Sequence, residues 1–433
     1  MAKVAFHTLG CKVNQYETEG MMTQFEQLGY DIVSFSEKAD IYIINTCTVT
    51  NMADKKSRQM LAKAKKTNPK GLVVAVGCYV QASNKELLEM IQVDLLIGNT
   101  DKGNMVQVIE TYLESKIKPK VVDLSHYKVY DDLWISMAQD HTRAHIKIQD
   151  GCDQFCTYCI IPYARGRIRS RSSSSILEES RELAKNGYKE MVLTGIHLAS
   201  YGIQFEDYRL IDLLEDLQGI EGIERIRLGS LEPTLITHEF VRRLVKLSKV
   251  CNHFHLSLQS GHDDILKKMN RKYTTQDYKG AVEKLREQMP TCAITTDLIV
   301  GFPSETETQF EGTLAFMKAI GFADVHVFKY SKRNGTPAGR MKEQVSSKEK
   351  NMRSTKAIKA AEDMKNVFLS RFIDKEMDVL VEEQVIEDKH AYYVGHTTNH
   401  IKVYIQSNKV LEKNTMNTVE LIQRFKDGIL GSL

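Results

Sequence analysis

The chain has 433 residues, of which 42% are hydrophobic and 27% are charged, values that are ordinary for a folded globular protein of two or three domains. No run of residues approaches the roughly 18 consecutive apolar positions of a membrane-spanning helix. The start of the chain also lacks the basic and apolar regions of a secretory signal. We therefore expect a cytoplasmic protein with no membrane partner. Its formal net charge of +3 does not by itself demand a nucleic acid.

Basic residues gather in three segments. Residues 55–70 carry seven basic residues and no acidic one, residues 165–171 contain four arginines, and residues 329–359 carry ten basic residues against two acidic ones. One such segment is typical of a solvated helix face. Three of them together favour a polyanionic partner.

Residues 1–118 alternate between strand-like runs rich in Val and Ile and helical patterns. The strand-like runs are Lys3–His7, Ile41–Asn45, Leu72–Val76 and Asp94–Gly98. The clearest helical patterns are Asn14–Leu28 and Asp54–Lys66. Buried strands separated by helices predict βαβ units and an α/β domain with a mostly parallel sheet. The polar, irregular residues 119–141 predict a linker.

A second alternation of strands and helices fills residues 142–368. Its strand-like runs are Ala144–Gln149, Glu190–Gly195, Arg225–Ser230, His253–Leu258, Ala293–Gly301 and Asp324–Tyr330. Six β/α repeats of this length predict a partial (β/α)6 barrel, in which the loops after the strands carry the chemistry. Residues 369–433 instead show short β runs broken by Gly, Asn and Asp, which predict a small all-β barrel.

Three cysteines, Cys152, Cys156 and Cys159, form a C-x3-C-x2-C motif directly after the first strand of the predicted barrel. Zinc prefers four ligands, commonly as two separated pairs, and this motif offers only three. Three thiolates instead suit a [4Fe-4S] cluster whose fourth iron stays open to a small molecule. The alternatives are a zinc site and unrelated buried thiols.

Three further cysteines, Cys11, Cys47 and Cys78, each follow a predicted strand of the N-terminal sheet. The ends of parallel strands emerge at one edge of a sheet, so these loops converge although they are far apart in the sequence. The pattern predicts a second cluster with an open iron, and chance placement is the alternative. Cys251 and Cys292 have no cysteine nearby and are interpreted as buried thiols.

The C-x3-C-x2-C motif, with Tyr158 before its last cysteine, resembles the signature of the radical S-adenosylmethionine (SAM) enzymes. In that family the open iron binds the amino and carboxylate groups of SAM, and an electron from the cluster cleaves SAM into methionine and a deoxyadenosyl radical. Strand ends such as "VLTGIHLASYG" and "DLIVGFPSET" also resemble the family's cofactor-binding segments. The resemblance implies cofactor contacts from Tyr158, Thr194, Gly195, Ser230, Glu232, Gln259 and Arg271. The alternative is that these polar residues only satisfy strand ends or cap helices.

Over essentially its whole length, the chain resembles the methylthiotransferases, which combine a three-cysteine α/β domain, a radical SAM barrel and a TRAM-like RNA-binding barrel. "HTLGCKVNQYETE" and "CTYCIIPYARGR" are most similar to the branch that modifies threonylcarbamoyladenosine in tRNA. Two positions depart from the family pattern. Ser172 stands where the family usually has Pro, and Ser304 where it usually has Gly.

The resemblance implies insertion of sulfur and a methyl group at carbon 2 of N6-threonylcarbamoyladenosine, next to the anticodon. The implied cofactors are SAM and two [4Fe-4S] clusters. The catalytic cluster would be held by Cys152, Cys156 and Cys159, and the auxiliary, sulfur-carrying cluster by Cys11, Cys47 and Cys78. The implied partners are the tRNA anticodon stem-loop, an electron donor and a sulfur donor, the last two unidentified.

Four arginines directly after the cluster motif are the candidate contacts to RNA phosphates, with ion pairs inside the barrel as the alternative. They are Arg165, Arg167, Arg169 and Arg171. Two other substrates stay open for the same chemistry, an isopentenyladenosine in tRNA and an aspartate of a ribosomal protein. A different class also stays open, an RNA-binding protein whose cysteines hold structural metal only.

Overall fold

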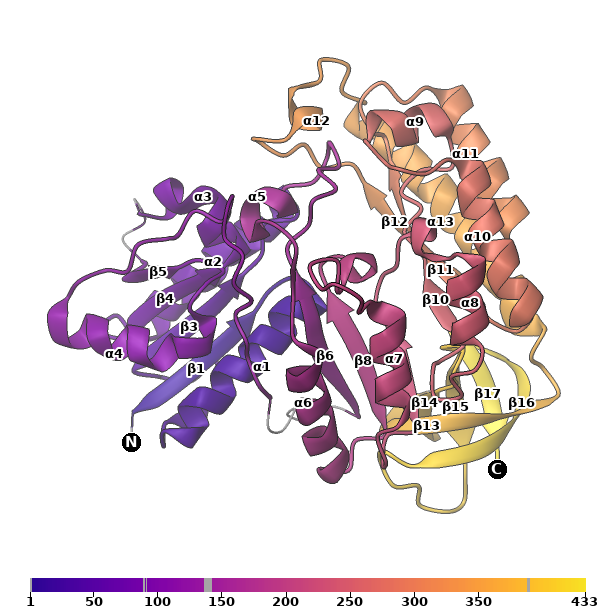
Figure 1. The fold of residues 1–433 in the computed structure, drawn as a ribbon, viewed down its shortest axis with the longest axis horizontal. Coiled ribbons are helices and arrows are strands. Elements are labelled where there is room, and N and C mark those ends of the chain that lie inside the picture. Colours follow the sequence, from indigo (N-terminus) through magenta and orange to yellow (C-terminus); the bar gives the residue numbers. More distant parts are fainter. Residues whose placement is uncertain (1, 89, 91, 136–141, 388–389) are drawn as a thin grey trace.

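The structure is a computed structural model that describes residues 2–88, 90, 92–135, 142–387 and 390–433. An N-terminal α/β part, a central barrel and a C-terminal β barrel follow one another along the chain (Figure 1). The N-terminal part lies along one side of the central strands, and the C-terminal barrel lies below them in the same view. Among the described residues, no helix is both long and apolar enough to cross a membrane.

The N-terminal part contains a five-stranded, all-parallel sheet, which confirms the predicted fold class. In spatial order its strands are β2 (Asp31–Val33), β1 (Lys3–Thr8), β3 (Ile41–Thr46), β4 (Leu72–Gly77) and β5 (Leu95–Ile97). Its helices are α1 (Lys12–Gln27), α2 (Asn51–Thr67), α3 (Cys78–Leu88), the 3-10 turn η1 (Lys102–Asn104) and α4 (Met105–Ser115). The edge strand β2 was not predicted, because three half-exposed residues carry little hydrophobic pattern.

The central part forms a partial barrel from two sheets, joined by isolated bridges from Ile226 to Val250 and from Leu231 to Leu256. Its strands are β6 (Arg143–Asp150), β7 (Arg169–Ser170), β8 (Glu190–Gly195), β9 (Arg225–Leu228), β10 (His253–His255), β11 (Ala293–Val300) and β12 (Asp324–Lys329). All pair in parallel except β7, a two-residue strand that the sequence analysis missed.

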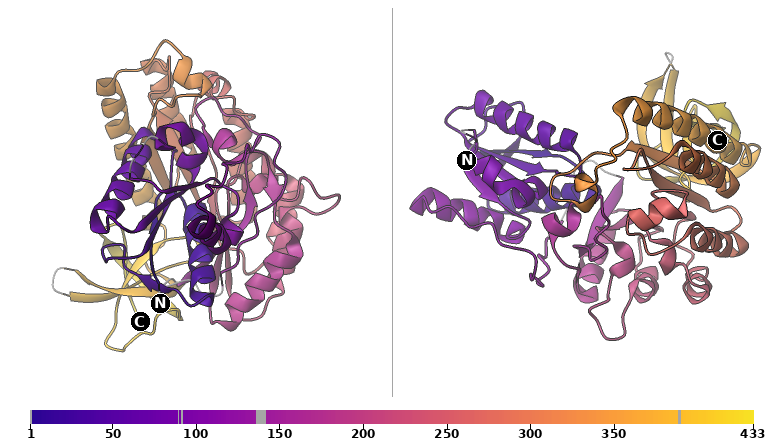
Figure 2. Two further views of the ribbon diagram at one scale, coloured as in Figure 1. Left: turned by 90° about the vertical axis from the view of Figure 1, so that its left-hand side faces the viewer. Right: turned by 90° about the horizontal axis from the view of Figure 1, so that it is seen from above.

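Helices cover the outside of this barrel (Figure 2). The helices and 3-10 turns of the central part are α5 (Ile161–Arg165), α6 (Ser173–Lys185), η2 (Leu198–Ser200), α7 (Leu210–Gln218), η3 (Pro233–Leu235), α8 (His238–Leu244), α9 (Asp263–Lys268), α10 (Thr275–Gln288), α11 (Glu307–Ile320), α12 (Pro337–Arg340) and α13 (Ser347–Ser370). Capping boxes begin the longer ones: Thr274 pairs with Asp277, and Ser346 with Glu349.

The strands divide their side chains between the helices and the barrel interior. On β11, the side chains of Ile294, Leu298 and Val300 pack into the core beneath the helices. Because side chains alternate along a strand, Thr295 and Asp297 face the interior. The interior is therefore polar, whereas the layer between strands and helices is apolar.

The C-terminal barrel closes the amino ends of the central strands. Its strands are β13 (Lys375–Glu387), β14 (His390–His396), β15 (Lys402–Gln406), β17 (Gly428–Ser432) and β16 (Met416–Phe425), in spatial order. Arg225 donates hydrogen bonds to the carbonyls of His396 (2.8 Å) and Asp378 (2.7 Å), and Arg227 donates to Thr398 (3.2 Å). The predicted boundary between residues 368 and 369 falls inside α13.

The described residues of the predicted linker, 119–135, contain no helix or strand but are packed between the two parts. Leu124, Leu133 and Ile135 are buried. The Asp131 carboxylate accepts the backbone N–H of Lys102 at 3.0 Å. This segment is therefore part of the contact between the N-terminal sheet and the barrel.

A buried ion network ties α1 to the barrel. The Arg165 guanidinium binds Glu17 Oε1 at 2.8 Å and Asp150 Oδ2 at 3.1 Å. Lys147 Nζ binds the same two carboxylates at 2.8 and 2.7 Å, and Lys102 also binds Glu17. All five side chains are almost fully buried, so each charge depends on the others for its stability.

A second contact joins the start of α2 to the segment between β12 and α12. Arg333 binds Asp54 at 2.6 Å and donates to Asn51 and Thr48 at 2.7 and 2.6 Å. Asn51 in turn donates to the carbonyl of Lys332 at 3.1 Å. The N-terminal part is thus held at both open edges of the partial barrel.

Replacing Arg165 by Met should destabilise the protein by about 3–5 kcal/mol, because two buried carboxylates lose a partner. The exposed Arg167, whose side chain is 48% accessible, is the matched control, and Arg167→Met should cost at most about 1 kcal/mol. Urea unfolding of both variants measures the difference. Equal stability of the two variants would show that the network does not hold the parts together.

Candidate functional site

The first cysteine loop (residues 152–159) begins where β6 ends and is held by backbone hydrogen bonds. Cys152 N–H donates to the carbonyl of Gly166 at 3.0 Å, and Thr157 N–H donates to Met269 at 3.0 Å. Gly151 has φ +71° and lies so close to Arg167 that a Cβ would stand 1.8 Å from its carbonyl oxygen. Only glycine fits at this turn, which directs the loop over the carboxyl end of the barrel.

The three thiols of this loop lie close enough to affect one another. Burial, together with the charge of Cys156, raises the pKa of both Cys152 and Cys159 to about 12. Without a metal, Cys152 and Cys159 are therefore protonated at neutral pH. A metal that binds thiolates must displace those protons, so assembly of a cluster here would release protons.

The other three cysteines also come together. Burial, with smaller contributions from the charges of Cys78 and Cys11, raises the pKa of Cys47 to about 11. Cys47 Sγ lies 2.8 Å from the position that a Cβ on Gly10 would take, so only glycine fits beside this sulfur. The predicted convergence at the sheet edge is thus seen in the structure.

The two cysteine groups lie on either side of one helix contact. Asn99 Nδ2 lies 3.5 Å from Cys78 Sγ and donates to the carbonyl of Ala164 at 2.7 Å. Cys78 begins α3, and Ala164 belongs to α5, which follows the first cysteine loop. Figure 1 shows α3 and α5 next to each other where the two parts meet.

The ion network leaves unbalanced positive charge beneath the second cysteine group. Three cations, Lys102, Lys147 and Arg165, face two carboxylates, Glu17 and Asp150. The Arg165 charge lowers the pKa of Cys47, and the charge of Cys78 acts on both Arg165 and Lys102. Three thiols beside excess positive charge fit an anionic thiolate-bound cluster.

Glu232 is the centre of a polar group beside the first cysteine loop. It binds Arg271 at 3.0 Å and His197 at 2.7 Å and accepts from Gln154 at 3.1 Å. Arg271 also lies 3.3 Å from Cys156 Sγ. Burial raises the pKa of Glu232, but His197 and Arg271 outweigh it and hold the pKa below its ordinary value. An anion therefore stands at the mouth of the barrel.

The other expected cofactor contacts are spread around this mouth. Thr194 is buried at the end of β8, Ser230 is exposed, and Gln259 has φ +67° with both backbone groups bonded to β11. A Cβ on Gly195 would stand only 3.1 Å from Cβ of Gln149, so the strand ends are closely packed at this position. The ring of Tyr158 packs against a small apolar cluster that includes Met269 and Phe302.

Three of the four arginines expected to contact RNA are inside the protein. Arg165 is 0% exposed within the ion network, Arg169 stands 3.7 Å from Asp150, and Arg171 binds Asp132 at 2.6 Å. The expectation of phosphate contacts from these three is therefore corrected: their charges are paired inside the fold. Arg167 alone is exposed, stacked 4.9 Å from the centre of the Phe155 ring.

Both departures from the family pattern have local explanations. Ser172 caps α6 by accepting the backbone N–H of Ser175. Ser304 has φ +60°, the left-handed region that favours glycine, and its hydroxyl accepts from Lys268 at 2.7 Å. Neither position supplies a cysteine or touches one.

The sequence analysis missed the polar wall inside the barrel. His255, Asp297 and His326, from β10, β11 and β12, bring their polar atoms within 4.8 Å of one another. His197, which binds Glu232, was also missed. Strand alternation was the available signal, because these residues alternate with the apolar positions that pack against the helices.

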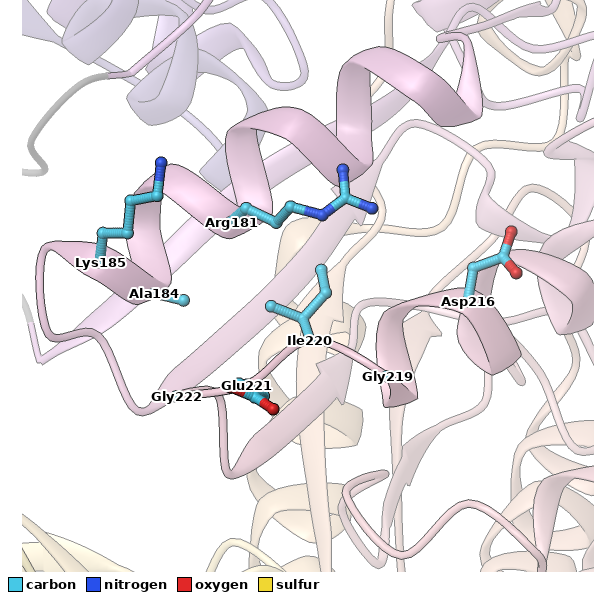
Figure 3. A pocket seen from close by; sticks show the side chains of 8 residues that line it. All are labelled: Arg181, Ala184, Lys185, Asp216, Gly219, Ile220, Glu221 and Gly222. Atoms are coloured by element: carbon cyan, nitrogen blue, oxygen red, sulfur yellow. The ribbon is translucent and has the colours of Figure 1, made fainter.

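A surface hollow of about 620 Å³ lies elsewhere, between α6 and the segment after α7 (Figure 3). Arg181, Lys185 and Asp216 are among its lining residues. It contains no cysteine and lies on the helix layer outside the barrel. It therefore adds nothing to the site.

Two known families match the chain. Residues 3–98 match the family described as "Uncharacterized protein family UPF0004", and residues 146–317 match the "Radical SAM superfamily". The first match contains Cys11, Cys47 and Cys78, and the second contains the C-x3-C-x2-C loop.

The relatives that are most similar in sequence include methylthiotransferases. The chain is 43% identical over 406 residues to the threonylcarbamoyladenosine tRNA methylthiotransferase MtaB of Bacillus subtilis, covering 93% of this chain and 90% of that one. The chain belongs to the radical SAM methylthiotransferase family. It is also 35% identical to a tRNA-2-methylthio-N(6)-dimethylallyladenosine synthase of Natranaerobius thermophilus, over 88% of this chain and 84% of that one.

Among solved structures, the radical SAM methyltransferase TsrM of Kitasatospora setae shares the fold. The TM-score is 0.60 at 15% identity, over 78% of this chain and 77% of that one. Radical SAM enzymes use a [4Fe-4S] cluster and SAM, and methylthiotransferases carry two clusters. The two cysteine groups, with the positive charge beside each, fit that requirement.

Replacing Cys47 by Ala should remove one cluster, roughly four of eight iron atoms per chain, because three thiolates are the minimum that holds a cluster with an open iron. Cys251→Ala is the matched control, since that buried thiol has no cysteine nearby, and it should keep all its iron. Iron and sulfide analysis after anaerobic reconstitution measures both. Full iron content in Cys47→Ala would contradict the second cluster site.

Proposed function

We propose that this protein is a tRNA methylthiotransferase that converts N6-threonylcarbamoyladenosine beside the anticodon to its 2-methylthio derivative. The observation that carries the proposal is the second cysteine group. One SAM-binding cluster would serve any radical SAM reaction. A second three-thiol site meeting the first across α3 and α5 supports sulfur insertion.

The cysteines are the proposed cluster ligands. Cys152, Cys156 and Cys159 would hold the cluster that binds SAM, and Cys11, Cys47 and Cys78 the auxiliary cluster. When bound, the clusters and SAM supply the radical and sulfur chemistry that replaces a C–H bond by a C–S bond. Arg165 and Lys102 would stabilise the thiolate-bound state of the auxiliary site through their positive charge.

The proposed cofactor contacts act by position and charge. Glu232 is an anion fixed by two cationic or hydrogen-bonding partners, so it can accept hydrogen bonds from the SAM amino or ribose groups without moving. Arg271 would place a positive charge 3.3 Å from Cys156 Sγ, beside the proposed cluster. Thr194, Gly195, Ser230, Gln259 and Tyr158 remain proposed contacts around the same mouth.

The proposed RNA contacts lie on exposed basic side chains. Arg167 stands beside the first cysteine loop. Lys55 and Lys56 at the start of α2, and Lys332 and Lys342 near α12, are exposed on either side of the contact made by Arg333. The C-terminal barrel has no net positive charge, since residues 371–433 carry eight basic and ten acidic side chains. We therefore assign phosphate binding to these exposed basic side chains, where the N-terminal part meets the central barrel, rather than to the C-terminal barrel.

The polar interior favours the threonylcarbamoyl substrate over an isopentenyl one. A threonylcarbamoyl group carries a carboxylate, a hydroxyl and two N–H groups, whereas an isopentenyl group carries none of these. Burying the apolar group against His255, Asp297 and His326 would leave polar groups without partners. Isopentenyladenosine in tRNA and the ribosomal protein are the alternative substrates, and the activity measurements below distinguish them from threonylcarbamoyladenosine.

The reconstituted enzyme should methylthiolate an anticodon stem-loop that carries threonylcarbamoyladenosine, given SAM, sulfide and a reductant. Mass spectrometry of the digested nucleosides measures the product. Cys156→Ala is the control and should give none, because the SAM-binding site is lost.

The same measurement in cells uses tRNA from a strain that lacks this gene. The 2-methylthio derivative should disappear and its precursor accumulate. Turnover of the isopentenyladenosine stem-loop or of the ribosomal protein, but not of the threonylcarbamoyladenosine stem-loop, would overturn the proposed substrate.

A further inference from the structure

Two residues on one face of β12 point into the barrel and are not covered. Val325 and Val327 pack on the helix side, so His326 and Phe328 lie on the interior face. The His326 side chain is 58% exposed, and Phe328 is 50% exposed. β12 is an edge strand of the partial barrel, and an uncovered aromatic ring there forgoes the favourable burial of its apolar surface.

Asp297 on β11 holds His326 in place. His326 Nδ1 lies 3.2 Å from Asp297 Oδ1, and His255 Nε2 lies 3.4 Å from Asp297 Oδ2. His255 Nδ1 in turn lies 3.0 Å from the hydroxyl of Thr295. Within the described part of the chain, His326 Nε2 has no hydrogen-bond partner, so this edge of the ring faces the interior.

His255, Asp297 and His326 form a polar wall of the barrel. The charges of this wall are complementary to a ligand that carries hydrogen-bond donors as well as a carboxylate. The hydrogen bond to Asp297 raises the pKa of His326, so this ring carries positive charge over a wider pH range. Burial raises the pKa of Asp297, but the two histidines outweigh it and keep this carboxylate ionised. The other charges that act on His326 are those of Asp324 and Lys365, which oppose each other and form an ion pair at 2.9 Å.

We propose that His326, Asp297 and Phe328 form the subsite that recognises the amino-acid adduct of the target adenosine. His326 Nε2–H donates to the adduct carboxylate, and Asp297 accepts from its hydroxyl or N–H groups. Each carboxylate oxygen accepts more than one hydrogen bond, so Asp297 keeps its histidine contacts. Phe328 offers a ring face on which the flipped adenine stacks. This inference rests on the proposed function, which it extends to the residues that select the substrate.

The same three polar side chains also form a possible donor set for a divalent metal, two imidazoles and one carboxylate. The surroundings favour the anionic adduct instead. A His326 ring that keeps its proton offers a hydrogen-bond donor to an anion, whereas a metal ion needs the lone pair of a neutral imidazole. The uncovered Phe328 ring beside His326 suits a base rather than a hydrated ion.

The test compares His326→Leu and His326→Gln with the wild-type holoenzyme on stem-loops carrying unmodified adenosine, isopentenyladenosine or threonylcarbamoyladenosine. Loss of one charge-assisted hydrogen bond should lower kcat/KM for the threonylcarbamoyl stem-loop about 10- to 100-fold in His326→Leu. Fluorescence anisotropy should show the same loss in Kd, so the readout does not depend on turnover. His326→Gln should keep part of the affinity, because its amide still donates.

The pH profile separates recognition from a structural role. The wild-type preference for the threonylcarbamoyl stem-loop should fall as pH rises past the raised pKa of His326, since the imidazolium loses its proton. His326→Gln should show no such fall. His238→Leu, at an exposed histidine on the outer helix α8, is the matched control and should behave as wild type.

Three results have distinct meanings. An unchanged preference in His326→Leu, with wild-type turnover of the threonylcarbamoyl stem-loop, would overturn this inference alone. A stoichiometric metal other than iron that is bound by wild type and lost in His326→Leu would overturn it in favour of a metal site. A wild-type enzyme that acts only on the isopentenyl stem-loop would overturn the proposed function itself.

Discussion

The buried ion network around Arg165 is the interaction on which the arrangement of this protein depends. It joins Glu17 of α1 to Asp150 and Lys147 of β6, so it sets the position of one cysteine group relative to the other. Buried charges are stable only while all their partners are present. The network therefore permits one docking of the N-terminal part and penalises every other.

The same network also acts on the chemistry. Its excess positive charge lies beside Cys47 and Cys78, where thiolates must form before a cluster can bind. On the other side of the α3–α5 contact, the Arg271 guanidinium lies 3.3 Å from Cys156 Sγ. Structural charges would thus lower the electrostatic cost of the two clusters proposed at these cysteines. Arg165, Arg169 and Arg171, which the sequence suggested as RNA contacts, instead form ion pairs inside the protein.

The partial barrel leaves a polar interior that is closed differently at its two ends. At the amino ends of the strands, Arg225 and Arg227 bind backbone carbonyls of the C-terminal barrel. At the carboxyl ends, the cysteine loop and Glu232 line the mouth. Between them, the wall with His326 stays uncovered. A nucleoside that enters where the N-terminal part meets the central barrel would meet charged and hydrogen-bonding groups. Such groups are suitable partners for a polar adduct.

The sequence alone determined the order of the three parts, the parallel sheet, the partial barrel and both cysteine groups. These features depend on local patterns, namely buried strands, helices between them and cysteines at strand ends. Only the tertiary structure decided which arginines are free, because burial depends on Glu17 and Asp150, residues distant in the chain. It also brought His255, Asp297 and His326 together, since strand pairing and not sequence spacing sets those contacts.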